Sequence, residues 1–381
     1  MTEPTKRAWA TINRNALKKN LAQVRIHCPD SKIIPVIKSN AYGHGLAEVA
    51  GVFSAAGSPA SLLAVATLTE ALQLHELDTG LPILLLGGFI NEEELALCLD
   101  RGIEPVVHSG FQVQLLLDTL GQTLSGQKRR LWLKLNTGMN RLGMAAVELQ
   151  QAYQQLHGIP GTELVLMSHL AWADAPQDSA ASEFTESQLQ RFGQSRQLLA
   201  RALQEPVAGS FAASAGILSQ PDSHHDYVRP GIMLYGSSPL NEQTGEELGL
   251  QPVMTLSARL MAINEVAAGE SIGYGATYTC KQATRVGVVS IGYGDGYPRA
   301  ASNGTPVLVK TSGGDLRTRL IGRVSMDMIT IDLTGIDAAS INDEVVLWGE
   351  GLCADEVARS AGTIAYELFC QVTPRVQRFH V

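Results

Sequence analysis

The chain has 381 residues, of which 45% are hydrophobic and 17% charged, a composition typical of a globular protein with a large core. The formal net charge is −8 and the pI is about 5.6, so no basic excess points to nucleic acid or to an anionic membrane surface. A small molecule is therefore the expected partner.

The five cysteines are scattered, show no CxxC pair and no metal-ligand spacing, and are odd in number. This pattern favours reduced thiols in a cytoplasmic protein without a metal site. No apolar segment follows the charged residues at positions 1–7, so no signal peptide is expected. The longest apolar runs also fall short of the ~20 residues that span a bilayer.

In chain order, residues 8–12 resemble a short strand, and Asn13 or Asn15 could begin a helix with Leu17, Leu21 and Val24 on one face. Strand-like runs and amphipathic helical stretches then alternate. The strand-like runs are 32–38, 61–67, 82–87, 104–108, 131–136, 163–169, 209–214 and 226–229, and the clearest helical stretches are 68–77, 92–99, 146–156 and 182–203. About eight such units over roughly 240 residues predict a TIM (β/α)8 barrel, with a doubly wound open sheet as the alternative.

Polar residues with possible chemistry follow the apolar runs at their C-terminal ends, which a barrel gathers into one mouth. These residues are Lys38, Asn136, Arg141, His169, Ser214 and Arg229.

The pattern changes after Gly236. Residues 237–247 are polar and rich in turn formers, and strand signals with little helical spacing follow them. The sequence therefore predicts an α/β protein with two domains. Residues 1–240 form the barrel, residues 241–381 form a mainly β domain, and residues 1–12 are expected to pack with the second domain.

The segment 36–45, Val-Ile-Lys-Ser-Asn-Ala-Tyr-Gly-His-Gly, places Lys38 where a buried strand meets a loop. Burial there lowers the pKa of an amine, and only the neutral amine attacks a carbonyl. An isolated lysine at a strand end is more often merely solvated. The whole string, however, closely resembles the pyridoxal-phosphate attachment motif of the alanine racemase family, with Ser39 where that family usually has alanine.

A phosphate site is indicated near the end of the predicted barrel, where Gly231 precedes a short helical turn whose backbone amides attract an anion. The resemblance implies that Gly231 and Ile232 bind the cofactor phosphate through their amides. The resemblance also implies that the hydroxyls of Tyr42, Ser214 and Tyr366 bind the phosphate.

Arg229 matches the arginine that faces the pyridine nitrogen in the resembled family. An arginine cannot give up its proton, so the ring nitrogen stays unprotonated and the ring is a weaker electron sink, which suits racemisation over transamination. The segment 210–214, Ser-Phe-Ala-Ala-Ser, keeps the phosphate serine but lacks the histidine and asparagine that the family usually shows. The surroundings of the cofactor must differ accordingly.

Racemisation needs a base on each face of Cα. The resemblance assigns these roles to Lys38 and to Tyr274, which lies in the segment 271–278. A tyrosine with a pKa of about 10 needs a hydrogen-bonding partner to act as a base near neutral pH. The resemblance implies that His169 is this partner and that it contacts Arg229. Because Tyr274 lies in the second domain, the resemblance implies a homodimer whose active sites are shared between subunits.

The resemblance also assigns the substrate contacts. Arg141 would bind the substrate carboxylate, Lys134 matches a lysine that is often carbamylated and would orient Arg141, and the Met326 amide would share the carboxylate. Asp327, next to Met326 in the same string, is also assigned to substrate binding, and Tyr293 matches a residue of the entrance. Crowding by Tyr293 and Tyr366 would leave room for little more than a methyl group.

These features predict a pyridoxal-phosphate-dependent alanine racemase, an isomerase that supplies D-alanine for peptidoglycan. The nearest alternative is a serine or broad-specificity racemase on the same fold. An amino-acid decarboxylase would need a larger pocket and a different proton donor, and a non-catalytic cofactor carrier would not need the second domain. A nucleotide-binding loop at 292–296 is excluded because the G-x-G-x-x-G spacing is absent.

Overall fold

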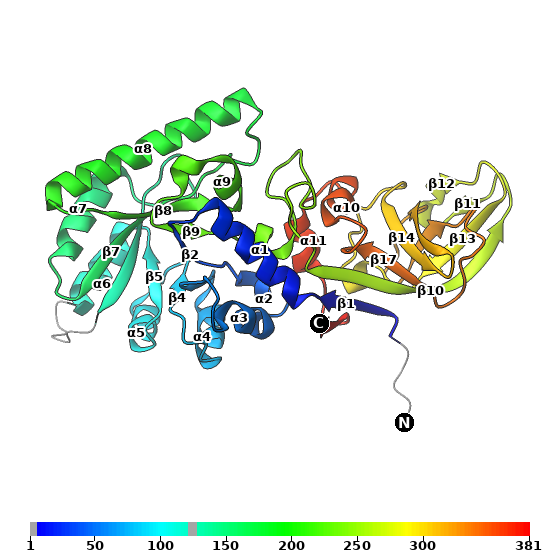
Figure 1. Cartoon of the computed structure of the whole chain (residues 1–381), viewed down its shortest axis with the longest axis horizontal. Coiled ribbons are helices and arrows are strands. Elements are labelled where there is room, and N and C mark those ends of the chain that lie inside the picture. Colours follow the sequence, from blue (N-terminus) through cyan, green and yellow to red (C-terminus); the bar gives the residue numbers. More distant parts are fainter. Residues whose placement is uncertain (1–5, 121–127) are drawn as a thin grey trace.

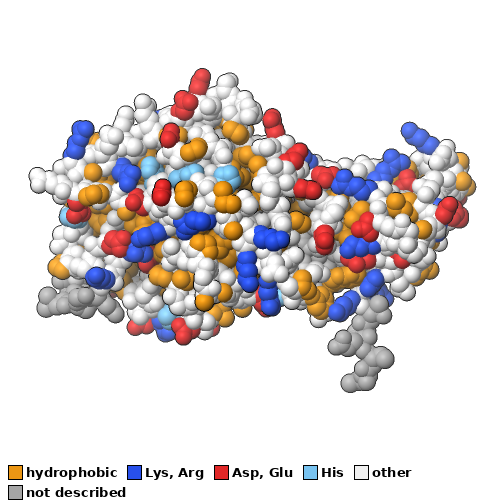
Figure 2. Space-filling model, viewed as in Figure 1, with side chains coloured by type: hydrophobic (Ala, Val, Ile, Leu, Met, Phe, Trp, Pro, Cys, Tyr) orange, Lys and Arg blue, Asp and Glu red, His pale blue; other side chains and the backbone are white. Residues whose placement is uncertain are grey.

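The computed structural model describes residues 6–120 and 128–381. It consists of a parallel sheet wrapped by helices and a β-rich part that carries the C-terminal third of the chain (Figure 1). Within the described ranges no helix has the length and apolar character needed to cross a membrane. The face drawn in Figure 2 carries acidic and basic side chains intermixed, without a broad field of one sign.

The parallel sheet has eight strands in the order β2-β9-β8-β7-β6-β5-β4-β3. Its members are β2 (Lys32–Ile33), β3 (Leu63–Val65), β4 (Ile83–Leu85), β5 (Glu104–Val107), β6 (Arg129–Lys134), β7 (Thr162–Met167), β8 (Ala208–Ala213) and β9 (Tyr227–Arg229). Parallel bridges from Ile33 to Ala60 and from Val36 to Ala64 join the two ends of this order. The predicted barrel class is therefore confirmed, and the open-sheet alternative is not needed.

Helices lie around the parallel sheet, and α2 lies on the side of the barrel that faces the β-rich part (Figure 1). They are α1 (Arg14–His27), α2 (Lys38–Tyr42), α3 (Leu46–Ser54), α4 (Leu68–Glu76), α5 (Glu92–Asp100), α6 (Gly110–Leu120), α7 (Ala146–His157), α8 (Ser179–Leu203) and α9 (Ser214–Ser219). Asn13 caps α1, as predicted, because its Oδ1 accepts from the amides of Asn15 and Ala16. A capping box of Thr67 and Glu70 begins α4.

The second part is built on an eight-stranded sheet that includes the N-terminal strand β1 (Ala8–Ile12). Its other strands are β10 (Met254–Val266), β13 (Thr284–Val289), β14 (Pro306–Thr311), β15 (Gly314–Arg319), β16 (Ile329–Asp332), β17 (Glu344–Trp348) and β18 (Gln377–His380). Strand β1 pairs antiparallel to β10 and parallel to β18, so the described part of the N-terminal segment joins the C-terminal sheet. Residues 1–5, also expected there, lie outside the described residues.

Two features differ from the sequence-based elements. The run 32–38 contains the two-residue strand Lys32–Ile33 and an isolated bridge at Val36, and α2 begins at its last residue, Lys38. The second domain also contains two unpredicted helices, α10 (Ala354–Ser360) and α11 (Ala365–Gln371). Each has seven residues, which is too short for a helical repeat of apolar positions to stand out.

Candidate active site

Lys38 is the first residue of α2, and the four residues after it form a left-handed turn. Ser39, Asn40, Ala41 and Tyr42 all have φ between 52° and 55°. None of them is glycine, and the left-handed helical conformation costs L-residues roughly 1–2 kcal/mol each. Such a turn persists only where its surroundings over-determine it, and strain of this kind is concentrated at functional sites.

The segment Gly43-His44-Gly45 satisfies the carbonyl groups of this turn. The Gly43 amide donates to Ser39 O at 2.9 Å and the Gly45 amide donates to Asn40 O at 3.0 Å. His44 Nδ1 lies 3.1 Å from Ala41 O and 2.8 Å from Tyr42 O. Because both neighbours are acceptors, Nδ1 carries the proton. Burial lowers the pKa of His44 to about 3, so the ring is neutral at pH 7.

Gly43 is required by packing as well as by its backbone conformation. Its φ is +78°, and a Cβ atom there would lie 2.1 Å from Phe369 O of α11. The turn is thus pressed against α11, which also carries Tyr366. The ring of Tyr42 stacks on Tyr235 at 4.7 Å and lies 5.9 Å from Tyr366.

Lys38 is half-buried, and its electrostatic surroundings favour the neutral amine. Burial lowers the pKa of Lys38, and the nearby charge of Arg141 lowers it further. Glu70 and Cys370 oppose this effect. The lysine therefore has the property that the sequence analysis required of it.

Arg229, at the end of β9, is buried and points its guanidinium at neutral oxygens. It donates to Ser210 Oγ, to Ser168 O at 2.6 Å and to Phe211 O at 3.1 Å. Ser210 Oγ in turn donates to Tyr227 O at 3.1 Å. The only proton of this hydroxyl is thereby used, so its oxygen faces Arg229 as an acceptor. Burial lowers the pKa of Arg229 to about 10, which leaves it charged at pH 7.

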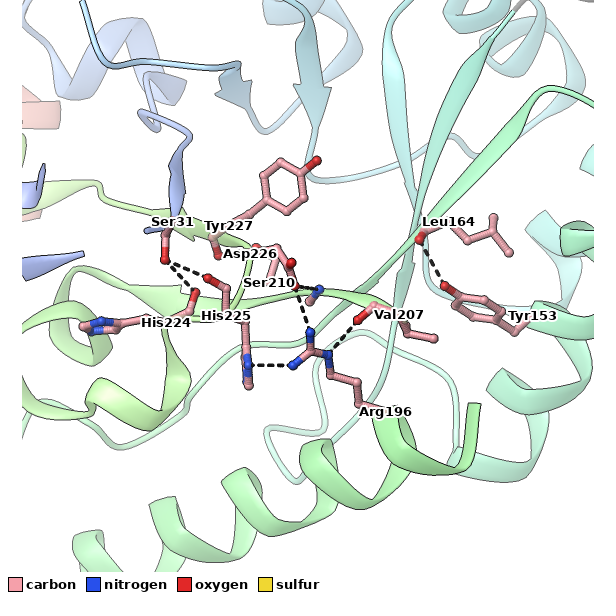
Figure 3. A network of polar contacts seen from close by, with 11 residues as sticks. Ser31, Tyr153, Leu164, Arg196, Val207, Ser210, His224, His225, Asp226 and Tyr227 are labelled. Carbon is pink, nitrogen blue, oxygen red and sulfur yellow. Dashed lines mark hydrogen bonds and ion pairs between the residues drawn. The ribbon is translucent and has the colours of Figure 1, made fainter. Parts of the chain in front are cut away.

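A polar network joins α8 to the beginnings of β8 and β9, the strands that carry Ser210 and Arg229 (Figure 3). Arg196 of α8 donates to Val207 O at 2.7 Å and to Asp226 Oδ2 at 3.0 Å, just before β8 and β9. Asp226 Oδ2 also accepts from the Gly209 amide at 2.7 Å. These bonds fix how β8 and β9 lie against each other, and therefore where Ser210 and Arg229 meet.

Ser214 and Gly231 meet at the carboxyl ends of the same two strands. The buried Ser214 Oγ accepts from the amides of Gly231 at 2.8 Å and Met233 at 3.4 Å. A Cβ atom on Gly231 would lie 2.6 Å from Tyr42 Oη, so only glycine keeps this space. Ile232 begins the 3-10 turn η2 (Ile232–Tyr235), as predicted for this stretch. The five hydroxyl and amide groups expected around the phosphate thus come from segments that contact one another.

Lys134 ends β6, and the loop that follows it carries Arg141. The loop is closed by Met144, whose amide donates to Lys134 O at 2.8 Å, and by Asn136, whose side chain caps the amides of Gly138 and Asn140. Burial and the charges of Arg229, Arg141 and Lys38 lower the pKa of Lys134 to about 8. A substantial fraction of this amine is therefore neutral near physiological pH.

His169 follows β7 and lies close to the same cations. Burial, Arg229, Lys134, Arg141 and Lys38 together lower its pKa to about 3, so His169 is neutral at pH 7. Gln188 of α8 holds its backbone by donating to His169 O at 3.1 Å, while the Ala171 amide donates to Gln188 Oε1 at 2.8 Å.

The remaining predicted residues lie in the β domain. Tyr274 is 73% exposed in η3 (Tyr274–Ala276), between β11 (Ser271–Ile272) and β12 (Tyr278–Thr279). These strands lie at the end of the molecule farthest from the barrel, whereas α2 lies in the middle (Figure 1). A single chain therefore does not bring Tyr274 to Lys38.

Met326, Tyr293 and Asp327 form a second group. The Tyr293 amide donates to Ser325 O at 3.1 Å and the Gly294 amide to Met326 O at 2.8 Å, so these loops lie together. The side chains of Met326 and Tyr293 are 53% and 39% exposed. Asp327 forms an ion pair with Arg375 at 2.7 Å.

Two residues around Lys38 were not found from the sequence as site residues. His44 lies in the lysine motif, but its contact with the turn depends on positive φ angles. The residue types Ser, Asn, Ala and Tyr at positions 39–42 do not predict these angles. Glu70 contacts the turn from the first turn of α4, and its only sequence signal was the capping-box spacing from Thr67.

The sequence was compared with models of known protein families. Residues 12–239 match the family model "Alanine racemase, N-terminal domain", and residues 253–380 match "Alanine racemase, C-terminal domain". The chain belongs to the alanine racemase family.

Individual members of the alanine racemase family match nearly the whole chain. An alanine racemase from Alcanivorax borkumensis is 47% identical over 367 residues, which cover 96% of this chain and 97% of that protein. The crystal structure of the biosynthetic alanine racemase from Pseudomonas aeruginosa has a TM-score of 0.89 at 40% identity, with 99% and 100% of the two chains covered. The Bartonella henselae alanine racemase, solved with covalently bound pyridoxal phosphate, has a TM-score of 0.84 at 28% identity, with 98% and 99% covered.

Proposed function

We propose that this chain is a pyridoxal-phosphate-dependent alanine racemase, an isomerase that interconverts L- and D-alanine. The observation that carries the proposal is Lys38, a half-buried lysine of lowered pKa held on a left-handed turn at the mouth of the barrel. The family membership, with relatives that match both domains, supports the same activity. The domains would divide near residue 240, at the turn-rich segment before β10.

The residues around Lys38 fit pyridoxal phosphate. Lys38 would hold the cofactor through Nζ. Arg229, a buried cation whose hydrogen bonds within the described residues go to neutral oxygens, would face the pyridine nitrogen. The amides of Gly231 and Ile232 and the hydroxyls of Tyr42, Ser214 and Tyr366 would hold the phosphate. The absence of a side chain at Gly231, beside Tyr42 Oη, supports this arrangement.

When bound, pyridoxal phosphate supplies an electron sink that makes the Cα proton of an amino acid acidic. The chain must then hold and move that proton. Lys38, whose pKa is lowered, would act on one face of Cα, and Tyr274 on the other. His169, neutral and beside Arg229, would orient the hydroxyl of Tyr274.

The substrate carboxylate would be bound by Arg141 and by the Met326 amide. Lys134, with a pKa of about 8, has enough neutral amine to add carbon dioxide, and the resulting carbamate would orient Arg141. Asp327, next to Met326, would also bind the substrate. Tyr293 would line the entrance, and Tyr293 and Tyr366 would restrict the side chain of the substrate to a methyl group.

The exposed position of Tyr274, far from Lys38 within one chain, supports a homodimer in which each subunit lends Tyr274 to the other. A mixture of Lys38→Ala and Tyr274→Phe chains tests the sharing. Exchange of subunits would restore one intact site in each mixed dimer, and no recovery of activity would contradict it. In a bacterial cell the D-alanine product would supply peptidoglycan.

The activity itself is tested by incubating the purified protein and pyridoxal phosphate with L-alanine and, separately, with L-serine, followed by chiral analysis. Rapid conversion of alanine with little conversion of serine is expected. Comparable rates would favour the broad-specificity alternative, and amine products or no inversion would overturn the racemase proposal.

A further inference from the structure

The carboxylate of Glu70 contacts three backbone amides from two separate loops. Its Oε2 accepts from the amides of Ala66 at 2.9 Å and Thr67 at 3.1 Å, which complete the beginning of its own helix α4. Its Oε1 accepts from the Ser39 amide at 2.6 Å. Ser39 lies 31 positions earlier in the chain, so this third bond has no part in starting α4.

The Ser39 amide is the first donor of the left-handed turn. Two later donors find acceptors nearby in the chain: the Ala41 amide donates to Ile37 O and the Gly43 amide donates to Ser39 O. Ser39 lies at the open beginning of the turn, where helical geometry offers no internal acceptor. Glu70 fills this position with a charged acceptor, the stronger kind of hydrogen-bond partner.

Glu70 also balances the charges around Lys38. The groups that face Lys38 are Arg141 and Lys134 from β6 and its loop, His169 from the loop after β7, Cys370 from α11, and Glu70 from α4. Arg141 lowers the pKa of Lys38, and Glu70 raises it. Glu70 is the only carboxylate among these named neighbours.

We propose that Glu70 is a positioning residue for Lys38. Glu70 holds the beginning of the left-handed turn through the Ser39 amide, and it offsets the positive charge around the lysine. The inference rests on the proposed catalytic role of Lys38. The capping of α4 explains the bonds to Ala66 and Thr67. It does not explain the bond to Ser39, which lies in a different segment.

Helix α5 offers a matched control. Glu94 occupies the same third position after the N-cap Asn91 and is half-buried like Glu70. Among the described residues, its carboxylate accepts from the Ile90 amide of its own helix entry alone. Glu94→Gln therefore removes a capping carboxylate without touching Lys38. Glu70→Gln removes the charge and presents an amide in place of one carboxylate oxygen, and Glu70→Asp keeps the charge but shortens the reach.

The first readout is hydrogen–deuterium exchange of the full-length chain, followed by mass spectrometry of the segment around Ser39. Exchange at residues 39–42 should quicken by about tenfold or more in both Glu70 variants and stay unchanged in Glu94→Gln. Unchanged exchange in Glu70→Gln would overturn the positioning role.

The second readout is the pH dependence of Lys38 acylation by acetic anhydride after removal of pyridoxal phosphate. Loss of a negative charge lowers the pKa of a neighbouring amine, so the midpoint should move to lower pH in Glu70→Gln. It should stay near the unaltered value in Glu70→Asp and in Glu94→Gln. An unmoved midpoint in Glu70→Gln would overturn the electrostatic role.

Racemisation is the third readout. A misplaced Lys38 should lower kcat by about tenfold or more in Glu70→Gln, with little change in KM for L-alanine. A kcat equal to that of the unaltered protein would contradict the inference. If the unaltered protein failed to racemise alanine, the proposed function would fail, while exchange and acylation would still decide the role of Glu70.

Discussion

His44 Nδ1 donates a hydrogen bond to the carbonyl oxygen of Tyr42 at 2.8 Å, across the end of the left-handed turn that begins beside Lys38. The centre of the same ring lies 4.6 Å from that of Tyr235, in a tilted arrangement, and 5.1 Å from that of Phe369, edge to face. One neutral side chain therefore satisfies the strained backbone and packs it against two parts of the protein.

Replacement of His44 by phenylalanine should separate these two tasks. The ring contacts would persist, but the buried carbonyls of Ala41 and Tyr42 would lose a donor, which should lower the free energy of unfolding by about 1–3 kcal/mol. Urea unfolding measures the change. His27→Phe, on the exposed end of α1, should alter stability by less than about 0.5 kcal/mol. Equal effects of the two substitutions would show that the His44 bonds are not needed.

The neutral state of His44 also predicts how stability depends on pH. Its pKa falls from 6.5 to about 3 on folding, so the unfolded chain binds more protons between these values. Stability is then complete above pH 6.5 and decreases as the pH falls through this window. Between pH 7 and pH 5 His44 alone should account for a loss of about 2 kcal/mol.

His169, lowered to about 3, and His225, lowered to about 4, should act in the same direction. Urea unfolding at both pH values should therefore show a smaller loss for His44→Phe than for the unaltered protein. A loss of the same size in both would contradict a buried neutral His44.

Ser210 should be needed to hold Arg229 at the end of β9. Ser210→Ala removes an acceptor from Arg229 and a donor from the buried Tyr227 carbonyl, and should lower stability by about 1–3 kcal/mol and also reduce kcat. Ser219→Ala removes a hydroxyl whose bonds, in the part of the chain that the structure describes, go to the carbonyls of Ala173 and Ala215, and it should leave kcat unchanged. An unaltered kcat in Ser210→Ala would argue against a role for this serine in placing Arg229.

Lys134 should react with carbon dioxide more readily than surface lysines. Its pKa of about 8 leaves a neutral fraction that an ordinary lysine lacks at pH 7 to 8. Protein incubated with carbon-13 bicarbonate should give a carbamate signal by NMR that Lys134→Ala abolishes. Lys310→Ala, which removes a lysine paired with Glu344, should retain it. Persistence of the signal in Lys134→Ala would place the carbamate elsewhere.

The sequence contained enough information for the barrel, because short continuous apolar runs and amphipathic helical stretches alternate along its first part. It also indicated local features whose causes lie within a few residues, such as the Asn13 cap and the turn after Gly231. The left-handed turn was not predictable in this way. Ser39, Asn40, Ala41 and Tyr42 have no common preference for positive φ, and the turn depends on Glu70, His44 and Phe369 O, which tertiary packing brings to it.

The most direct test of the two-base account is deuterium uptake at Cα by the Tyr274→Phe variant in deuterated water. L-alanine and D-alanine are supplied separately with pyridoxal phosphate, and Tyr278→Phe, a tyrosine of the same hairpin, serves as the control. The account predicts that inversion falls by about 100-fold or more, while one enantiomer alone continues to take up deuterium without inversion. Equal loss of uptake from both enantiomers, or undiminished inversion, would contradict the assignment of Tyr274 as the base opposite Lys38.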